Sequence, residues 1–184
     1  PLTYDETGPC GMSKLTDAFA AGVLKYLPNI VALTAPSAIS YERLTPHRWS
    51  AAYNNLGFRD REASLRVCPV TAKDPASIAR QFNIEYRAAD AAASPYLALA
   101  AIVHAGVQGI EDDLTAPAPT EEDLSLLPPA DLQARGFVRL PETLEAALEA
   151  FTAEPVVTGW FPKDFAAVYR AHKEGELAHL EGLD

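Results

Sequence analysis

The hydrophobic pattern near the start of the chain predicts one amphipathic helix. Ser13 is a residue type that caps helices, and apolar side chains recur at three- and four-residue spacing after it. Pro28 follows the last of them, and a proline removes a backbone donor from a helix. The pattern therefore predicts a helix over about residues 14–27 that ends before Pro28. The apolar stripe consists of Leu15, Phe19, Val23 and Leu27.

Two short stretches alternate apolar and polar residues, as half-buried strands do. They are "ASLRV" at 63–67 and "NIEYRA" at 83–88, while residues 35–58 are predicted to be irregular or briefly helical. Two strands do not form a stable sheet alone. Either the irregular stretch hides further strands, or the sheet is completed by sequence outside this chain.

Ser94 and Pro95 begin a second helical pattern, which is apolar on most of its sides. At about 16 residues it is too short to span a bilayer, so it is predicted to be a buried core helix with His104 as a core residue. Amphipathic patterns predict further helices over residues 129–135, 141–153 and 162–180. The chain is therefore predicted to have an α+β fold, with several helices packed on a few antiparallel strands.

Composition excludes several classes of protein. A length of 184 residues suits one domain, and 48% hydrophobic and 22% charged residues are typical of a soluble globular protein. The formal net charge of −10 argues against a nucleic-acid partner, which calls for a basic face, and against an anionic membrane surface.

The cysteines and the chain start bear on where the protein works. Cys10 and Cys68 are far apart and do not have the spacing of a zinc site or a disulfide framework, so a cytoplasmic location is expected. No segment has the length of a membrane span or the pattern of a signal peptide. The sequence starts without Met and in turn-like residues, which suggests a piece of a longer protein.

The chemistry-bearing feature is a run of arginines without a single lysine, at positions 43, 48, 59, 61 and 66. A guanidinium group presents a planar fork of donors that matches carboxylate and phosphate oxygens two at a time. Glu85 and Arg87 share one face of the second predicted strand, and Arg66 lies on the polar face of the first. If the strands are neighbours, one carboxylate and several guanidinium groups form a site suited to nucleotide phosphates and a divalent cation.

The same residues are open to a second interpretation. Acidic side chains in and beside the arginine run could neutralise it as an ordinary ion-pair network. These side chains are Glu42, Asp60, Glu62 and Glu85.

Three motifs, taken in order, resemble the C-terminal half of the catalytic domain of the glutamine synthetase family. They are "LTAPSAISYERLTP", "RDREASLRVCP" and "IEYRAADAAASPYLALAAIVHAGVQGI". The family's second motif runs close to R-N-R-S-A-S-I-R-I-P. The opening segment and "FVRLPETLEAALEAF" are also similar to the family, so the resemblance covers almost all of residues 1–184. It implies a partial glutamine-synthetase catalytic domain.

The resemblance implies a role for each matched residue. Arg43 matches the arginine that holds glutamate, and Arg61 and Arg66 match arginines on the ATP phosphates and the phosphoryl group in transit. Glu85 matches a ligand of a divalent metal, Mg²⁺ or Mn²⁺, and Arg87 matches an arginine on glutamate and its transferred phosphate. The implied reaction is phosphorylation of the γ-carboxylate of glutamate by ATP, followed by attack of an amine.

The chain departs from the family pattern at three positions. Trp49 stands where glutamine synthetases carry a glutamate that binds ammonium, and an indole ring is better suited to line a pocket for a bulkier amine. Asn83 replaces an arginine of the ATP site. Ser125 stands where some bacterial enzymes have a tyrosine that is adenylylated. Trp49 favours a γ-glutamyl amide ligase over an ammonia-using enzyme, and Ser125 suggests that control by adenylylation is absent.

The family's N-terminal β-rich domain and its other metal ligands are not in this sequence. In the family, that domain completes the active site from a neighbouring subunit, so a homo-oligomer with sites between subunits is expected of the full-length protein. One matched carboxylate is too few for a divalent cation, so residues 1–184 alone are predicted to be inactive. The alternative is a non-catalytic module that retains the fold.

Overall fold

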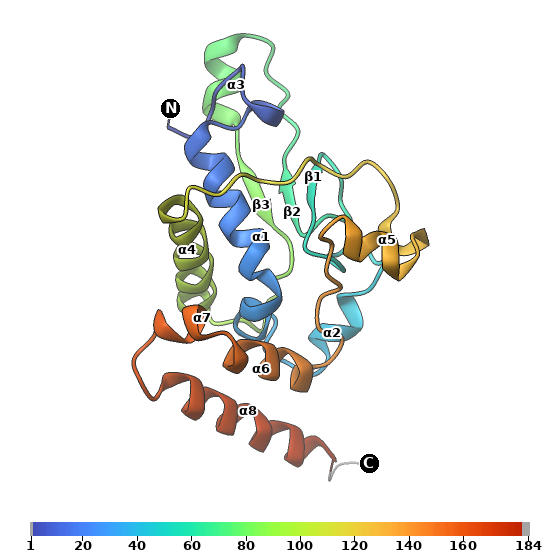
Figure 1. Cartoon of the computed structure of the whole chain (residues 1–184), viewed down its shortest axis with the longest axis vertical. Coiled ribbons are helices and arrows are strands. Elements are labelled where there is room, and N and C mark those ends of the chain that lie inside the picture. Colours follow the sequence, from blue (N-terminus) through green and yellow to red (C-terminus); the bar gives the residue numbers. More distant parts are fainter. Residues whose placement is uncertain (1, 182–184) are drawn as a thin grey trace.

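A computed structural model describes residues 2–181, which form eight α-helices, two short 3-10 helices and one three-stranded sheet (Figure 1). The helices are α1 (Lys14–Thr34), α2 (Ser40–Arg43), α3 (Pro75–Gln81), α4 (Pro95–Glu111), α5 (Pro129–Ala134), α6 (Leu144–Ala153), α7 (Pro155–Gly159) and α8 (Phe165–Glu181). The strands are β1 (Leu56–Phe58), β2 (Leu65–Val67) and β3 (Ile84–Tyr86), and the 3-10 helices are Pro9–Gly11 and Leu124–Leu126. The predicted α+β class is confirmed.

Helix α1 is the central element, with the sheet on one side and α4 on the other (Figure 1). Ser13 caps it as predicted, because its hydroxyl accepts a hydrogen bond from the Thr16 N–H (3.2 Å). The predicted end at Pro28 is wrong, since the helix continues through this proline to Thr34. Residues 30–33 are almost completely buried, so packing of this last turn outweighs the backbone hydrogen bond that the proline cannot make.

The sheet has the order β1-β2-β3 and is mixed. Strands β2 and β3 are antiparallel, as predicted, but β1 joins β2 in parallel, so the expectation of an all-antiparallel sheet is corrected. Strand β1 lies in the stretch predicted to be irregular, which bears out the alternative that this stretch hides a strand. A three-residue strand is only about 10 Å long, so the short connection 59–64 can return to its start and pair in parallel.

Helices α1 and α4 approach closely because small residues face each other. A Cβ atom on Gly22 would lie 2.2 Å from the Ala105 carbonyl oxygen and 2.6 Å from the Gly109 Cα. The interpretation of α4 as a buried core helix is therefore only half right. Its small-residue face is buried against α1, and a row of large apolar side chains faces outward. These exposed residues are Tyr96, Leu99, Val103 and Val107.

The C-terminal helices close one end of the core. Phe151 of α6 is fully buried and makes edge-to-face contacts with Phe165 and Tyr169 of α8. The Tyr169 hydroxyl donates to the Ala32 carbonyl at the end of α1 (2.7 Å). The predicted core position of His104 is wrong, because its ring is exposed and stacks on Trp160, with centroids 5.7 Å apart. No helix within residues 2–181 is long and apolar enough to cross a membrane.

Candidate functional site: an arginine cluster around Glu85

The centre of the site is one carboxylate held by two guanidinium groups. The antiparallel register of β2 and β3 pairs Arg66 with Glu85, and Arg87 follows β3 on the same face. Glu85 Oε2 accepts from Arg66 Nη2 (2.8 Å) and from Arg87 Nη1 (3.0 Å). The side chains of Arg66 and Arg87 are only 15% and 14% exposed. The strand pairing therefore brings these three predicted site residues together.

Arg43 joins this group from the end of α2. Its Nη1 donates to the Ser50 hydroxyl (2.6 Å) and its Nη2 donates to the Ala89 carbonyl (2.8 Å). A longer bond of 3.4 Å joins Arg43 Nη1 to the Arg87 carbonyl, so the two arginines are neighbours through the main chain. We use the name arginine cluster for Arg43, Arg66 and Arg87 together with Glu85.

The loop of residues 46–50, which follows α2, lies against the cluster. The Trp49 carbonyl accepts a hydrogen bond from Arg87 Nη2 (2.7 Å), while the residue as a whole is 66% exposed. Arg61 stacks its guanidinium group on this indole, 5.4 Å from the ring centroid. Arg61 therefore reaches the cluster through Trp49, and within residues 2–181 it makes no direct ion pair with Glu85.

The cluster carries more positive charge than the described residues neutralise. Arg66 and Arg87 share the single carboxylate of Glu85, and Arg43 bonds only a hydroxyl and main-chain carbonyls among the residues described, so the four side chains carry a formal charge of +2. The Nε atoms of Arg43, Arg66 and Arg87 are buried and have no hydrogen-bond partner within residues 2–181. A buried charged donor without a partner is costly, and the Nη hydrogen bonds of the same guanidinium groups offset part of that cost. The excess positive charge of the cluster favours an anionic partner.

The ion-pair-network interpretation holds for only one of the four acidic residues. Glu85 is paired, but Asp60 accepts from the Glu62 N–H (2.9 Å) and Glu62 accepts from two backbone N–H groups of the 46–50 loop. Glu42 is exposed and forms no ion pair among the residues described. The role of Glu62 was missed, because the spacing of acidic residues in a sequence does not show that a partner is a backbone N–H.

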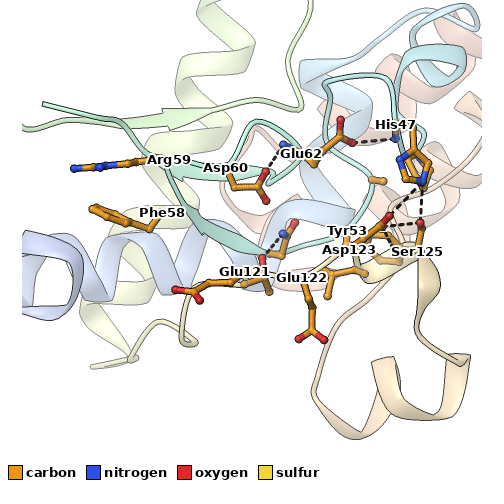
Figure 2. Close-up of a pocket in the computed structure, with 15 residues that line it drawn as sticks. His47, Tyr53, Phe58, Arg59, Asp60, Glu62, Glu121, Glu122, Asp123 and Ser125 are labelled. Atoms are coloured by element: carbon orange, nitrogen blue, oxygen red, sulfur yellow. Dashed lines mark hydrogen bonds and ion pairs between the residues drawn. The ribbon is translucent and has the colours of Figure 1, made fainter. Parts of the chain in front are cut away.

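A cavity of about 560 Å³ borders the other side of the 58–62 turn (Figure 2). Its floor includes Asn55 Nδ2, which donates to the Thr120 hydroxyl (2.8 Å). At one end, the His47 ring is within hydrogen-bond distance of the Ser125 hydroxyl (3.1 Å) and 3.4 Å from an Asp123 oxygen. The Ser125 hydroxyl and N–H both donate to Asp123 and lower the pKa of its carboxyl. The 120–125 segment is thereby tied to the 46–50 loop.

The residues described here do not form a metal centre. No group of three or more His, Cys, Asp and Glu side chains within residues 2–181 could hold a metal ion. The Cys68 thiol lies 3.9 Å from the same Glu85 oxygen that accepts from the two arginines, and a thiol is a soft group that Mg²⁺ does not prefer. Asn83 turns to its own segment and donates to the Gln81 carbonyl (2.9 Å), so it does not replace the missing arginine.

The chain is similar to known proteins over almost all of its length. The sequence model described as "Glutamine synthetase, catalytic domain" matches residues 1–183. The chain belongs to the glutamine synthetase family. Among its relatives, the γ-glutamylpolyamine synthetase GlnA3 of Streptomyces coelicolor is 39% identical over 180 residues, which is 97% of this chain and 38% of the relative. A glutamine synthetase of the same organism is 33% identical over 84% of this chain and 31% of its own length.

Two solved structures have the same fold as this chain. A structure titled as a novel glutamine synthase homolog superposes with a TM-score of 0.80 at 41% identity, covering all of this chain and 39% of the other. A structure titled GmaS/ADP complex superposes with a TM-score of 0.77 at 26% identity, covering 98% of this chain and 40% of the other. The chain thus spans less than half the length of these relatives.

Proposed function

We propose that the chain is the C-terminal part of an ATP-dependent glutamate–amine ligase. The observation that carries this proposal is the arginine cluster, in which Arg66 and Arg87 hold the Glu85 carboxylate and Arg43 lies beside Arg87, so three guanidinium groups gather around a single acid. Transfer of a phosphoryl group to a carboxylate concentrates negative charge on both reactants. Preorganised guanidinium groups stabilise that charge more than water does, because they do not have to reorient.

The proposed roles assign the two substrates to different arginines of the cluster and to Arg61 beside it. Arg43 holds a carboxylate of glutamate, and Arg61 and Arg66 hold the phosphates of ATP. Arg87 lies between them and contacts both glutamate and the phosphoryl group in transit. A γ-carboxylate oxygen attacks the terminal phosphorus and ADP leaves; the amine nitrogen then attacks the acyl carbon, loses a proton, and phosphate leaves with the carboxylate oxygen.

The proposed acceptor is an organic amine larger than ammonia, with polyamines as the first class to test. Trp49 supports this choice, because its exposed indole can pack against a carbon chain but cannot bind ammonium as a carboxylate does. The name of the Streptomyces coelicolor relative supports polyamines.

Glu85 is proposed to supply one ligand to Mg²⁺ or Mn²⁺, which when bound neutralises phosphate charge. The residues described complete no such site, so the remaining ligands come from elsewhere in the assembled protein. We therefore propose that residues 1–184 alone do not turn over, and that the full-length protein is a homo-oligomer whose active sites are completed between subunits.

The test is amine-dependent ADP release by the whole polypeptide in which residues 1–184 occur. Glutamate, ATP and Mg²⁺ are supplied with ammonium, a monoamine, a diamine or a polyamine. We expect turnover with an organic amine, and we expect Arg87→Lys to lower kcat/KM about a hundredfold, since lysine keeps the charge but loses the forked contact.

Arg80→Lys is the matched control, because Arg80 bonds Ser77 within α3. It is expected to leave turnover unchanged. Turnover with ammonium alone would refute the organic-amine acceptor. ADP release that is equal with and without every amine, or an Arg87→Lys protein as active as the parent, would refute the proposed ligase.

A further inference from the structure

Two residues of the 46–50 loop have an unusual backbone conformation. His47 and Trp49 have φ angles of 61° and 55°, the left-handed region that residues other than glycine rarely occupy. Neither residue is a glycine, which adopts this region freely, so the conformation costs free energy that contacts outside the two residues offset.

The Glu62 carboxylate is the group that holds this loop. Its Oε2 accepts from the His47 N–H (3.0 Å) and its Oε1 accepts from the Trp49 N–H (2.8 Å). Main-chain N–H groups near left-handed residues form a concave anion-binding site, which a carboxylate from this same chain fills here. Glu62 is itself fixed, because its N–H donates to Asp60 Oδ1 (2.9 Å), so the turn after β1 and the 46–50 loop form one unit (Figure 2).

This unit is continuous with the arginine cluster. Trp49 donates its N–H to Glu62 and accepts at its carbonyl from Arg87 Nη2 (2.7 Å). The guanidinium group of Arg61 stacks on the indole of Trp49. A shift of Trp49 therefore moves its exposed indole, the carbonyl that accepts from Arg87, and the ring on which the Arg61 guanidinium group stacks.

We propose that Glu62 is a positioning residue that fixes Trp49 and thereby determines amine specificity. Its effect on turnover rests on the proposed ligase function, but its effect on the loop does not. Glu62 acts through the Trp49 backbone, because its two oxygens accept from the His47 and Trp49 N–H groups. Within the described part of the chain it has no arginine or lysine partner, so it is not one side of an ion pair.

The first test measures amide hydrogen exchange by NMR. In Glu62→Gln the side chain keeps one carbonyl oxygen, so one of the two N–H groups loses its acceptor. We expect exchange at the N–H that loses its acceptor, that of His47 or of Trp49, to become roughly tenfold faster. Glu42→Gln removes the same charge one helical turn before the loop, from an exposed side chain, and serves as the control. Unchanged exchange in Glu62→Gln, or equal changes in both variants, would overturn the proposal whether or not the protein is a ligase.

The second test uses the kinetics of the whole polypeptide with an accepted amine. We expect Glu62→Gln to raise KM for the amine roughly tenfold, with a smaller change in KM for ATP. A background of His47→Gly should restore part of the loss, because glycine adopts positive φ without help, and His47→Ala should not. A positioning role would be contradicted if Glu62→Gln raised KM for the amine and KM for ATP equally. It would also be contradicted if the His47→Gly and His47→Ala backgrounds recovered the same activity. A parent protein without turnover would count against the ligase alone, since the exchange test still decides the role of Glu62.

Discussion

Glu85→Ala gives the most informative stability prediction. The substitution removes the only carboxylate of the arginine cluster and leaves Arg66 and Arg87 facing each other without a counter-charge. Breaking a fully buried pair costs about 3–5 kcal/mol and an exposed pair costs about 0–1 kcal/mol. The side chains of the two arginines are about one-seventh exposed, but that of Glu85 is 39% exposed. Water therefore screens the ion pairs in part, and the expected cost lies between the two ranges. We expect a loss of about 2 kcal/mol in the free energy of unfolding.

The assay is urea unfolding followed by circular dichroism at pH 7, with Glu174→Ala as the matched control. Glu174 accepts from Arg170 Nε at 2.6 Å on the surface of α8, where both side chains are more exposed, and its loss should cost about 0.5 kcal/mol or less. Sulfate should restore stability to Glu85→Ala more than to the parent, because an anion fills the uncompensated positive site. Equal losses in the two variants, or equal effects of sulfate, would refute the charge argument.

Three further outcomes test the packing and the buried hydroxyl groups. Gly22→Ala should lower the free energy of unfolding by about 2–3 kcal/mol, because its Cβ would collide with Ala105 and Gly109. Urea unfolding measures this loss. An unchanged free energy of unfolding would contradict the close approach of α1 and α4. Tyr41→Phe should raise the melting temperature, corresponding to a gain of about 1–2 kcal/mol in the free energy of unfolding, because the Tyr41 hydroxyl is buried without a partner in residues 2–181. A lower melting temperature would show that the hydroxyl has a partner. Burial raises the pKa of Tyr41 and Tyr86 above the ordinary value of 10.0, so stability is full below pH 10 and falls as pH rises further; a urea midpoint that is the same at pH 9 and pH 11 would refute this.

The helices could be predicted well where local signals decide them. The Ser94–Pro95 start of α4 and the Ser13 cap of α1 both agree with the sequence pattern. The end of α1 could not be predicted from Pro28, because tertiary burial of residues 30–33 overrides the local penalty of the proline. Strand β1 has three residues and contains Gly57, so it gives almost no alternation to detect.

The candidate site could be predicted in its composition but not in its connections. The polar faces of two strands indicated that Arg66, Glu85 and Arg87 lie together, and the antiparallel register brings Arg66 opposite Glu85. The joining of Trp49 to this group depends on the left-handed backbone at 47 and 49. Such a conformation leaves no signal in residues that are neither glycine nor asparagine.

The central claim, that the arginine cluster serves transfer of a phosphoryl group onto glutamate, is tested most directly by following oxygen atoms. The whole polypeptide is incubated with ATP, Mg²⁺, an accepted amine and glutamate carrying ¹⁸O in its γ-carboxylate, and the released phosphate is analysed by mass spectrometry. The account predicts one labelled oxygen in each phosphate, because the carboxylate oxygen that attacks phosphorus leaves with it. ADP formation with unlabelled phosphate would mean that water is the acceptor and would contradict the account.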